Sequence, residues 1–462
     1  MTTMDVTGRL SHFAATLTLA DIPPGAIAQA KLCVLDLAGI MVRGCRDAES
    51  SPPIRRAVMR LGGTAAGPCT AVGEPQGMSA PLAALLNGAY GHSLDFDDTH
   101  QLASLHPGVC VIPAALAAAE LTSAGGADLL AAIVAGYDVA CRLGLAVDPE
   151  SHYARGFHPT ATCGVFGAAA AAGRILHLDA ARMAAALGLA ESRAAGSLQY
   201  LENGSWNKRL QPGFAAAAGI ETAILAEEGV IGAAEPIEGR LGFLHGYSDA
   251  AHPERAIEEL GARFEVTRTA LKPYPCCRYA HSALDGIRGL FARAGREGCG
   301  QVLDPAELER LEVGLNDAGM RLIGAPEDRK RNPANVVDGQ FSLHFVGAVA
   351  ALHGNMGWDD YRYLGDPAVR AFSERIAAVP DPGVRGVGCT ITARLRDGRV
   401  LHRAVAAPKG EPELPMSPDE VRAKFLDLAG DWRGAADTAA RILELERLPD
   451  VRALTEPLRA LA

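Results

Sequence analysis

Three segments of the chain place basic side chains beside a proline at the expected start of an alanine-rich helix. The segments are HPGVCVIPAALAAAE with His106 and Pro113, GFHPTATCGVFGAAAAAG with His158 and Pro159, and GSWNKRLQPGFAAAAG with Lys208, Arg209 and Pro212. Proline is favourable at a first helical position because the N–H that it lacks would be unpaired there. The remaining N–H groups and the positive end of the helix dipole attract anions. Each segment is therefore a candidate anion-binding helix start.

A single histidine before a helix has a plainer interpretation, as a capping or core residue. Three such segments within one region favour a shared role, because they would form a pocket for a polyanion if they converge in space. A histidine also titrates near neutrality and can act as a general acid or base. His106 and His158 are therefore the candidate proton-transfer residues, and Lys208 with Arg209 are candidate anion-binding residues.

The segment GHSLDFDDTHQ carries three carboxylates within four positions, followed by Thr99. On a helix, Asp95 and Thr99 are four apart and would share a face. Such close carboxylates repel one another unless a partner offsets the charge, and we expect no metal, because no second acidic cluster has EF-hand or facial-triad spacing. One interpretation is a solvated acidic helix end. The other is that one carboxylate orients a histidine such as His106 and raises its basicity.

The segment LKPYPCCRYAHSALDG opens a region of different texture. Lys272 stands in a proline-rich bend, and His281 stands near the expected start of a helix. A solvated lysine is the plainer interpretation, but a lysine at a domain junction could close over a carboxylate bound in a cleft. The adjacent Cys276 and Cys277 are interpreted as reduced thiols. No pair of the ten cysteines has CxxC spacing, so neither a zinc site nor a redox motif is indicated.

These residue types suit the removal of a proton next to a carboxylate. Negative charge builds on that carboxylate, so the site needs fixed cations and N–H donors, together with a base that titrates near neutrality. Lys, Arg and helix starts supply the charge here, and we expect neither a metal nor a cofactor. A non-enzymatic, polyanion-binding helical scaffold is the alternative from another class.

The totals limit the partners. A net charge of −10 without a basic block excludes a typical nucleic-acid ligand. Gly, Pro or charged residues interrupt the apolar stretches, and the N-terminus lacks a signal pattern, so we expect no membrane span and a cytoplasmic protein.

The order of elements predicts a mainly α protein with a smaller α+β domain. Apolar residues recur at helical spacing on both faces of segments up to about residue 265, as in a large helical bundle. Further on, VGCTITARLRDGRVLHRAVAA predicts a hairpin around Asp397–Gly398, while SALDGIRGLFARAG and DPAVRAFSERIAAV predict helices. Ser417 and Glu420 form a capping box for a final helical region. The predicted domains are residues 1–266, 267–408 and 409–462.

At these motifs the sequence resembles the MmgE/PrpD family, which includes 2-methylcitrate dehydratase, cis-aconitate decarboxylase and iminodisuccinate epimerase. The matching segments are GHSLDFDDTH with HPG, GFHPTATCG, SLQYLENGSWNKRLQPGFAAAAGIETAILAEEG, EGRLGFLHGYSD and LKPYPCCRYAH. The resemblance implies a large all-α domain built from both chain ends, an inserted α+β lid domain, and a homodimer. It implies catalytic roles for His106, His158 and Asp95. It also implies that Lys208 and Lys272 hold substrate carboxylates and that Thr99, with Asp95, orients the site. We expect Thr99, Lys208, Arg209, Lys272 and His281 together to form the substrate-binding set.

Within the family the reaction is open. We expect a 2-methylcitrate-dehydratase-like hydro-lyase acting on a small di- or tricarboxylate, with an iminodisuccinate-epimerase-like activity as the alternative. Decarboxylase-like members carry a tyrosine in the lid helix where this chain reads QFSLHFVGA, with Phe345 at that position. The missing hydroxyl argues against cis-aconitate decarboxylation.

Overall fold

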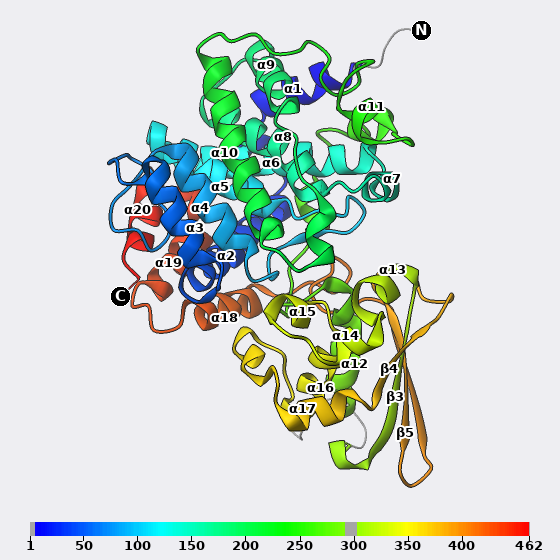
Figure 1. Ribbon diagram of the computed structural model, residues 1–462. Coiled ribbons are helices and arrows are strands. Elements are labelled where there is room, and N and C mark those ends of the chain that lie inside the picture. Colours follow the sequence, from blue (N-terminus) through cyan, green and yellow to red (C-terminus); the bar gives the residue numbers. More distant parts are fainter. Residues whose placement is uncertain (1–4, 292–302, 462) are drawn as a thin grey trace. The chain divides into compact units, whose positions relative to one another are not determined.

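The computed structural model describes residues 5–291 and 303–461, which form two compact units (Figure 1). The first unit comprises Met1–Ser93, Asp97–Leu271 and Ser417–Ala462, and the second comprises Leu94–Phe96 and Lys272–Met416. The expected divisions after residues 266 and 408 fall earlier than these. Thr269 and Ala270 pair with a strand of the first unit, and the backbone N–H of Lys409 donates to Asp285 of the second.

The first unit is almost entirely helical. Its helices are α1 (Val6–Thr16), α2 (Pro24–Asp47), α3 (Ser51–Val58), α4 (Ala80–His92), α5 (Gly108–Thr122), α6 (Gly126–Ala146), α7 (Pro149–Ala154), α8 (Pro159–Ile175), α9 (Ala180–Glu191), α10 (Asn207–Glu227), α11 (Phe243–Tyr247), α18 (Pro418–Ala429), α19 (Ala435–Leu443) and α20 (Arg452–Thr455). Two short strands, β1 (Thr99–His100) and β2 (Thr269–Ala270), pair antiparallel.

Helix α8 is the centre of this unit, with every residue buried and α5, α6, α9 and α10 packed around it (Figure 1). Small residues permit the close packing. An added Cβ at Gly219 of α10 would lie 2.4 Å from the Ala168 side chain, and one at Gly164 would lie 2.5 Å from the Cys110 sulfur. Gly164 and Ala168, four positions apart on α8, therefore serve helix packing. This rigid core carries the helix starts that bear the candidate site.

Helices α2 and α6 have the length and hydropathy of a membrane span, contrary to the expectation from the sequence. Both lie mostly inside the first unit, however. Helix α6 also carries a buried ion pair, in which Arg142 Nε lies 2.8 Å from Asp138 Oδ1. We interpret both as core helices.

The C-terminal helices complete the first unit. Ser417 and Glu420 form the predicted capping box at the start of α18, which packs on α2. Lys424 of α18 lies 2.6 Å from the buried Asp36 of α2. Both chain ends thus contribute to one helical unit.

The second unit packs helices on a four-stranded sheet of order β4-β3-β5-β6. Its strands are β3 (Leu308–Leu315), β4 (Ile376–Pro380), β5 (Cys389–Leu395) and β6 (Val400–Val405), and its helices are α12 (His281–Phe291), α13 (Asp317–Gly319), α14 (Glu327–Arg331), α15 (Val336–Gln340), α16 (Leu343–His353) and α17 (Pro367–Ser373). β3 is parallel to β4 and antiparallel to β5. The β5–β6 hairpin confirms the prediction at Asp397–Gly398, where Gly398 has a φ of 89°.

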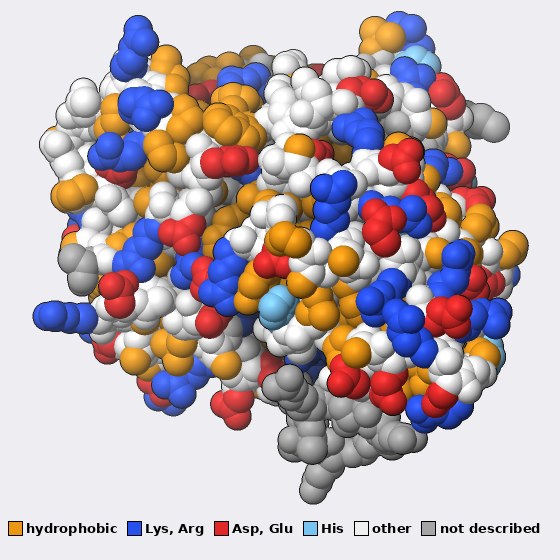
Figure 2. All heavy atoms as spheres, turned by 60° about the horizontal axis from the view of Figure 1, so that its bottom comes forward, with side chains coloured by type: hydrophobic (Ala, Val, Ile, Leu, Met, Phe, Trp, Pro, Cys, Tyr) orange, Lys and Arg blue, Asp and Glu red, His pale blue; other side chains and the backbone are white. Residues whose placement is uncertain are grey.

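Other local predictions need correction. The segment DPAVRAFSERIAAV is helical only in α17, and its last residues form β4, because pairing with β3 decides their conformation. The end of SALDGIRGLFARAG lies outside the described residues. On the face shown in Figure 2, basic and acidic side chains are interspersed, so the net acidic charge is not gathered in one region of that face.

Candidate active site

Three imidazoles and one buried carboxylate converge in the first unit. His92, the last residue of α4, lies 2.7 Å through Nδ1 from Asp97 Oδ2, and His106 Nδ1 lies 3.1 Å from the same oxygen. The His92 ring meets the His106 ring edge-on at 4.7 Å between centroids and stacks on the His158 ring at 6.1 Å. His92 and Asp97 are fully buried, whereas the His106 side chain is 14% exposed.

Asp97 is the charged centre of this cluster. Burial alone would raise its pKa, but the facing His106 and His92 hold the pKa well below its usual value. The carboxylate is therefore ionised and accepts from the Nδ1–H of His92. The Nδ1 atom of His106 lies 3.1 Å from the same oxygen, so the charge of Asp97 acts on this ring as well. One of the three carboxylates does face His106, and it is Asp97.

The same donors also resemble a metal-ligand set. Two imidazoles and one carboxylate bind ions such as Zn²⁺ or Fe²⁺, and the three ligand atoms lie within 4.8 Å of one another. Two ligands at right angles on one zinc ion are about 3.0 Å apart, given zinc–ligand bonds of about 2.1 Å. The 2.7 Å between His92 Nδ1 and Asp97 Oδ2 is shorter and fits a hydrogen bond. We therefore interpret the cluster as His92 hydrogen-bonded to Asp97, with His106 beside the same carboxylate oxygen.

His158 is held as a neutral imidazole with a defined tautomer. It is the N-cap of α8, with Pro159 at the first helical position as the sequence predicts. Its Nδ1 lies 2.6 Å from Gln211 Oε1, and Gln211 Nε2 donates to the backbone oxygen of Ser197 at 2.9 Å, which fixes the amide orientation. Nδ1 must therefore carry the proton, and Nε2 has the lone pair of a base. Burial, followed by His92 and Lys208, holds the pKa of His158 well below its usual value.

The starts of α5 and α8 fix the two histidines relative to each other. The backbone N–H of His106 donates to Thr160 Oγ1 in the first turn of α8 at 3.1 Å. Asp98 accepts from the Gly108 N–H at 3.1 Å and from the Tyr137 hydroxyl at 2.6 Å. Burial raises the pKa of Asp98 to about 7. The expected helix start at Pro113 is wrong, because α5 begins at Gly108 and Pro113 lies inside it.

Lys208 and Arg209 have different environments. Both lie in the first turn of α10, which begins at Asn207, so Pro212 lies inside this helix and does not start it. The charge of Lys208 acts on His158, which places the ammonium near the imidazole cluster. Arg209 is buried, donates to Ser50 Oγ at 3.0 Å and lies 3.5 Å from Glu49 Oε1. The charge of Lys208 thus acts on the imidazole cluster, whereas Arg209 is engaged with Ser50 and Glu49. Their roles in substrate binding stay predictions.

Asp95 and Thr99 do not share a helix face. The segment after α4 is not helical, Asp95 has a φ of 50°, and Thr99 belongs to β1. The prediction from helical spacing is wrong here because Asp95, Asp97 and Asp98 each pair with a different part of the chain. Thr99 is 6% exposed, and no described residue lies within hydrogen-bonding reach of its hydroxyl.

Lys272, His281 and Asp95 belong to the second unit. Lys272 Nζ donates to the backbone oxygen of Asp95 at 2.8 Å and lies 3.1 Å from its carboxylate. His281 starts α12, as the sequence predicts, and its Nε2 donates to the backbone oxygen of Cys276 at 3.2 Å. Burial, with the nearby charge of Lys272, lowers the pKa of His281 to about 3. Roles for these three residues in substrate binding or catalysis stay predictions.

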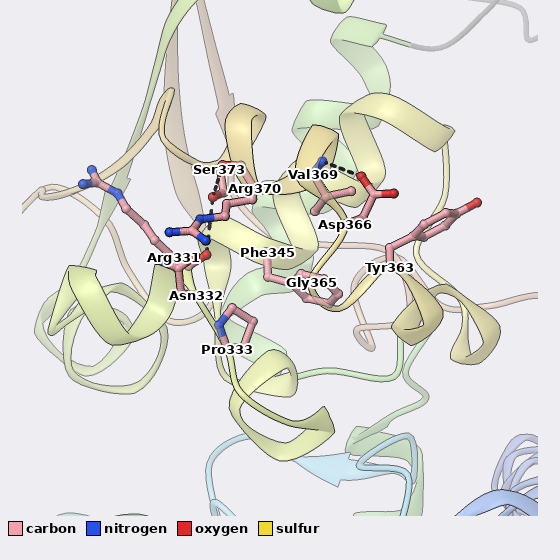
Figure 3. A pocket seen from close by; sticks show the side chains of 10 residues that line it. All are labelled: Arg331, Asn332, Pro333, Phe345, Tyr363, Gly365, Asp366, Val369, Arg370 and Ser373. Atoms are coloured by element: carbon pink, nitrogen blue, oxygen red, sulfur yellow. Dashed lines mark hydrogen bonds between the residues drawn. The ribbon is translucent and has the colours of Figure 1, made fainter.

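Phe345 stands in α16 and lines a pocket of about 320 Å³ within the second unit (Figure 3). Its ring stacks on Tyr361 at 5.9 Å, and the Tyr361 hydroxyl donates to the Pro275 backbone oxygen at 2.7 Å. Burial raises the pKa of Tyr361 well above its usual value, so this neighbouring phenol is a poor proton donor. The pocket is lined by none of the eight site residues predicted from the sequence.

Sequence reasoning missed His92, Asp97 and Gln211. His92 and Asp97 stand within the quoted GHSLDFDDTH motif, but their separation of five matches no helical pair spacing. Gln211 follows the Lys-Arg pair and carries no charge that would draw attention. Contacts made across the helical bundle bring these residues to the site.

Two family models match nearly the whole chain. The MmgE/PrpD N-terminal domain matches residues 8–256, and the MmgE/PrpD C-terminal domain matches residues 274–449. The cis-aconitate decarboxylase-like protein oryM of Aspergillus oryzae is 28% identical over 97% of this chain and 96% of its own length. The cis-aconitate decarboxylase of Aspergillus terreus is 28% identical over 98% of this chain and 95% of its own length. The human cis-aconitate decarboxylase is 26% identical over 84% of this chain and 82% of its own length.

The fold, the histidine cluster and these similarities define an enzyme of the lyase class. The chain belongs to the MmgE/PrpD family.

Proposed function

We propose that this lyase acts on a small di- or tricarboxylate by moving a proton at the carbon next to a carboxylate, without a metal. The observation that carries the proposal is the fixed tautomer of His158. Its Nδ1–H is committed to Gln211, whose amide is oriented by Ser197, so Nε2 is available as a base. A buried, neutral imidazole accepts a proton without first having to lose one.

The second histidine has the complementary environment. Asp97 is ionised and faces His106, and a carboxylate in this position stabilises the imidazolium form of the ring. His106 is thus suited to hold and donate a proton, while His158 is suited to remove one. Two titratable groups with opposed environments are the arrangement expected of an acid–base pair.

The leading reaction is the elimination of water from a hydroxy-polycarboxylate. His158 Nε2 takes the proton from the carbon next to a carboxylate, and the C–H electron pair forms the new C=C bond. The C–O bond breaks, His106 donates its proton to the departing hydroxyl, and water leaves. Lys208 stabilises the charge that builds on the substrate carboxylate.

A second candidate is the decarboxylation of a cis-aconitate-like tricarboxylate. It is favoured by the names of the relatives that match nearly the full chain at 28% identity. There the C–C bond to one carboxylate breaks, CO₂ leaves, and an imidazolium protonates the remaining carbanion. Phe345 offers no hydroxyl for this step, which is why we rank dehydration first.

Incubation of the full chain with citrate, 2-methylcitrate, cis-aconitate and iminodisuccinate in D₂O, followed by NMR, tests the proposal. New vinyl protons from a hydroxy acid would support dehydration. Release of CO₂ from cis-aconitate would support decarboxylation instead. Deuterium exchange without a net lyase product would favour epimerisation, the earlier alternative, and would contradict the proposed lyase reaction.

His158→Asn serves as the matched control, because it removes Nε2 and keeps an amide that can pair with Gln211. This variant should fold and lose turnover. Absence of exchange and turnover with every substrate would overturn the proposal. A homodimer and a cytoplasmic location, expected from the sequence, stay predictions.

A further inference from the structure

His92 is the imidazole that contacts both rings of the proposed acid–base pair. It meets His106 edge-on at 4.7 Å and stacks on His158 at 6.1 Å, and its own side chain is fully buried. A fully buried ring at the end of α4 does not depend on solvent for its hydrogen bonds. Its geometry therefore follows from Asp97 and the surrounding helices.

The hydrogen bond from His92 limits how strongly Asp97 acts on His106. Both Nδ1 atoms face the same oxygen, Oδ2, at 2.7 Å and 3.1 Å. An N–H donor at 2.7 Å disperses part of the carboxylate charge. Without that donor, Asp97 would direct its charge at His106 alone, and His106 would retain its proton too strongly to donate it.

The other titratable groups around His106 act in known directions. His158, on which the His92 ring stacks, is kept neutral chiefly by burial, with the charges of His92 and Lys208 acting in the same direction. The Cys110 thiol of α5 lies near Asp97 and is also neutral, because burial raises its pKa well above the usual value. Asp98, next to Asp97, has its pKa raised to about 7 by burial, and it accepts from Gly108 and Tyr137. The part of the electrostatic field at His106 that His92 controls is thus the division of Asp97 between two rings.

We propose that His92 is a positioning residue that sets the proton affinity of His106 by sharing Oδ2 of Asp97. This inference rests on the proposed function for its catalytic meaning, since His106 is the proton donor there. Its physical content, the coupling of two imidazoles through one carboxylate oxygen, is independent of any substrate.

The test compares His92→Phe with His92→Asn in the full chain. Asparagine places an amide near the position of Nδ1 and can still donate to Asp97, whereas phenylalanine keeps a ring and loses the donor. The titration midpoint of His106 is followed by NMR of its imidazole nitrogens, which needs no turnover. It should rise by roughly one pH unit in His92→Phe, the size of shift that one nearby charge commonly causes, and stay near wild type in His92→Asn.

Asp97→Asn should shift the same midpoint in the opposite direction, because the charge itself is removed. His344→Gln, a buried histidine of the second unit, serves as the control and should leave the midpoint unchanged. In any assay that detects turnover, the pH–rate profile of His92→Phe should move with the midpoint, and kcat should fall by at least about tenfold.

An unchanged His106 midpoint in His92→Phe, with the fold intact by circular dichroism, would overturn the role of His92. If His92→Phe does not fold, an unchanged midpoint in Asp97→Asn overturns it in the same way. A shifted midpoint in a protein that turns over no polycarboxylate would uphold the coupling and count against the proposed function alone.

Discussion

Lys272 and Asp95, 177 positions apart in the chain, form a buried pair in which the lysine ammonium binds both the backbone and the carboxylate oxygen of the aspartate. Both side chains are nearly inaccessible, at 3% and 5% exposure. Removal of one member leaves the other charge buried without its main partner.

Lys272→Met should therefore lower the free energy of unfolding by about 3–5 kcal/mol, measured by urea denaturation. The double variant Lys272→Met/Asp95→Asn should recover part of this loss, because no charge is then stranded. Arg399→Met is the matched control, since Arg399 pairs with Asp397 at an exposed hairpin and should change stability by less than about 1 kcal/mol. If Lys272→Met and Arg399→Met lower the free energy of unfolding by the same amount, the importance of the buried pair is contradicted.

Gln211 fixes the tautomer of His158, so changes at Gln211 should alter the pH dependence of turnover. A carboxylate in Gln211→Glu would stabilise the protonated imidazole and raise the pKa of His158 from its depressed value. The base would then be blocked at the acidic end, and the acidic limb of the kcat/KM profile should move to higher pH. Gln211→Leu should lower kcat by roughly tenfold to a hundredfold without that move. An acidic limb that stays in place in Gln211→Glu would contradict His158 as the base.

Lys208→Ala should abolish measurable turnover, because the carboxylate charge that builds in the reaction loses its cation. The protein should stay folded, since Lys208 is only partly buried at the start of α10. Lys208→Arg should retain part of the activity. Arg209→Ala, its neighbour, should chiefly lower the melting temperature, because Arg209 donates to Ser50. Near-normal rates in Lys208→Ala would remove this lysine from the site.

His152 makes the first unit sensitive to acid. Burial lowers the pKa of His152 to about 4, while the unfolded side chain has the usual value of 6.5. The unfolded chain therefore binds a proton first, and stability should be lost as the pH falls from about 6.5 to about 4. The difference in unfolding free energy between wild type and His152→Gln should narrow by up to about 3 kcal/mol across that range. A constant difference between wild type and His152→Gln across this pH range would refute the assignment.

Local sequence signals predicted much of the fold. Pro159 at the start of α8, the hairpin at Asp397–Gly398 and the capping box at Ser417 are each determined by residues within a few positions of one another. The signals failed where distant pairing decides the outcome. The residues IAAV have no preference that excludes a helix, yet they form β4 because β3 lies beside them.

For the site as well, local signals were readable in the sequence and long-range contacts were not. His106, His158 and Lys208 could be selected because a basic residue before an alanine-rich helix is visible in the sequence. The sequence could not decide among Asp95, Asp97 and Asp98. These three carboxylates lie within four positions and differ only in the partners that the folded chain brings to each. Asp95 pairs with Lys272, Asp97 faces His106 and His92, and Asp98 accepts from Tyr137. These partners come from different elements of the fold.

Residues Leu94–Phe96 belong to the second unit, although the chain on both sides belongs to the first. Because of this three-residue segment, neither unit can be exchanged as one continuous stretch of the chain. A chimera that exchanges residues 272–416 for those of a relative would join a foreign lysine to the resident Asp95. Exchange of residues 94–96 together with 272–416 keeps the partners matched, so the natural boundaries for exchanging this unit are the four cuts that enclose these two segments.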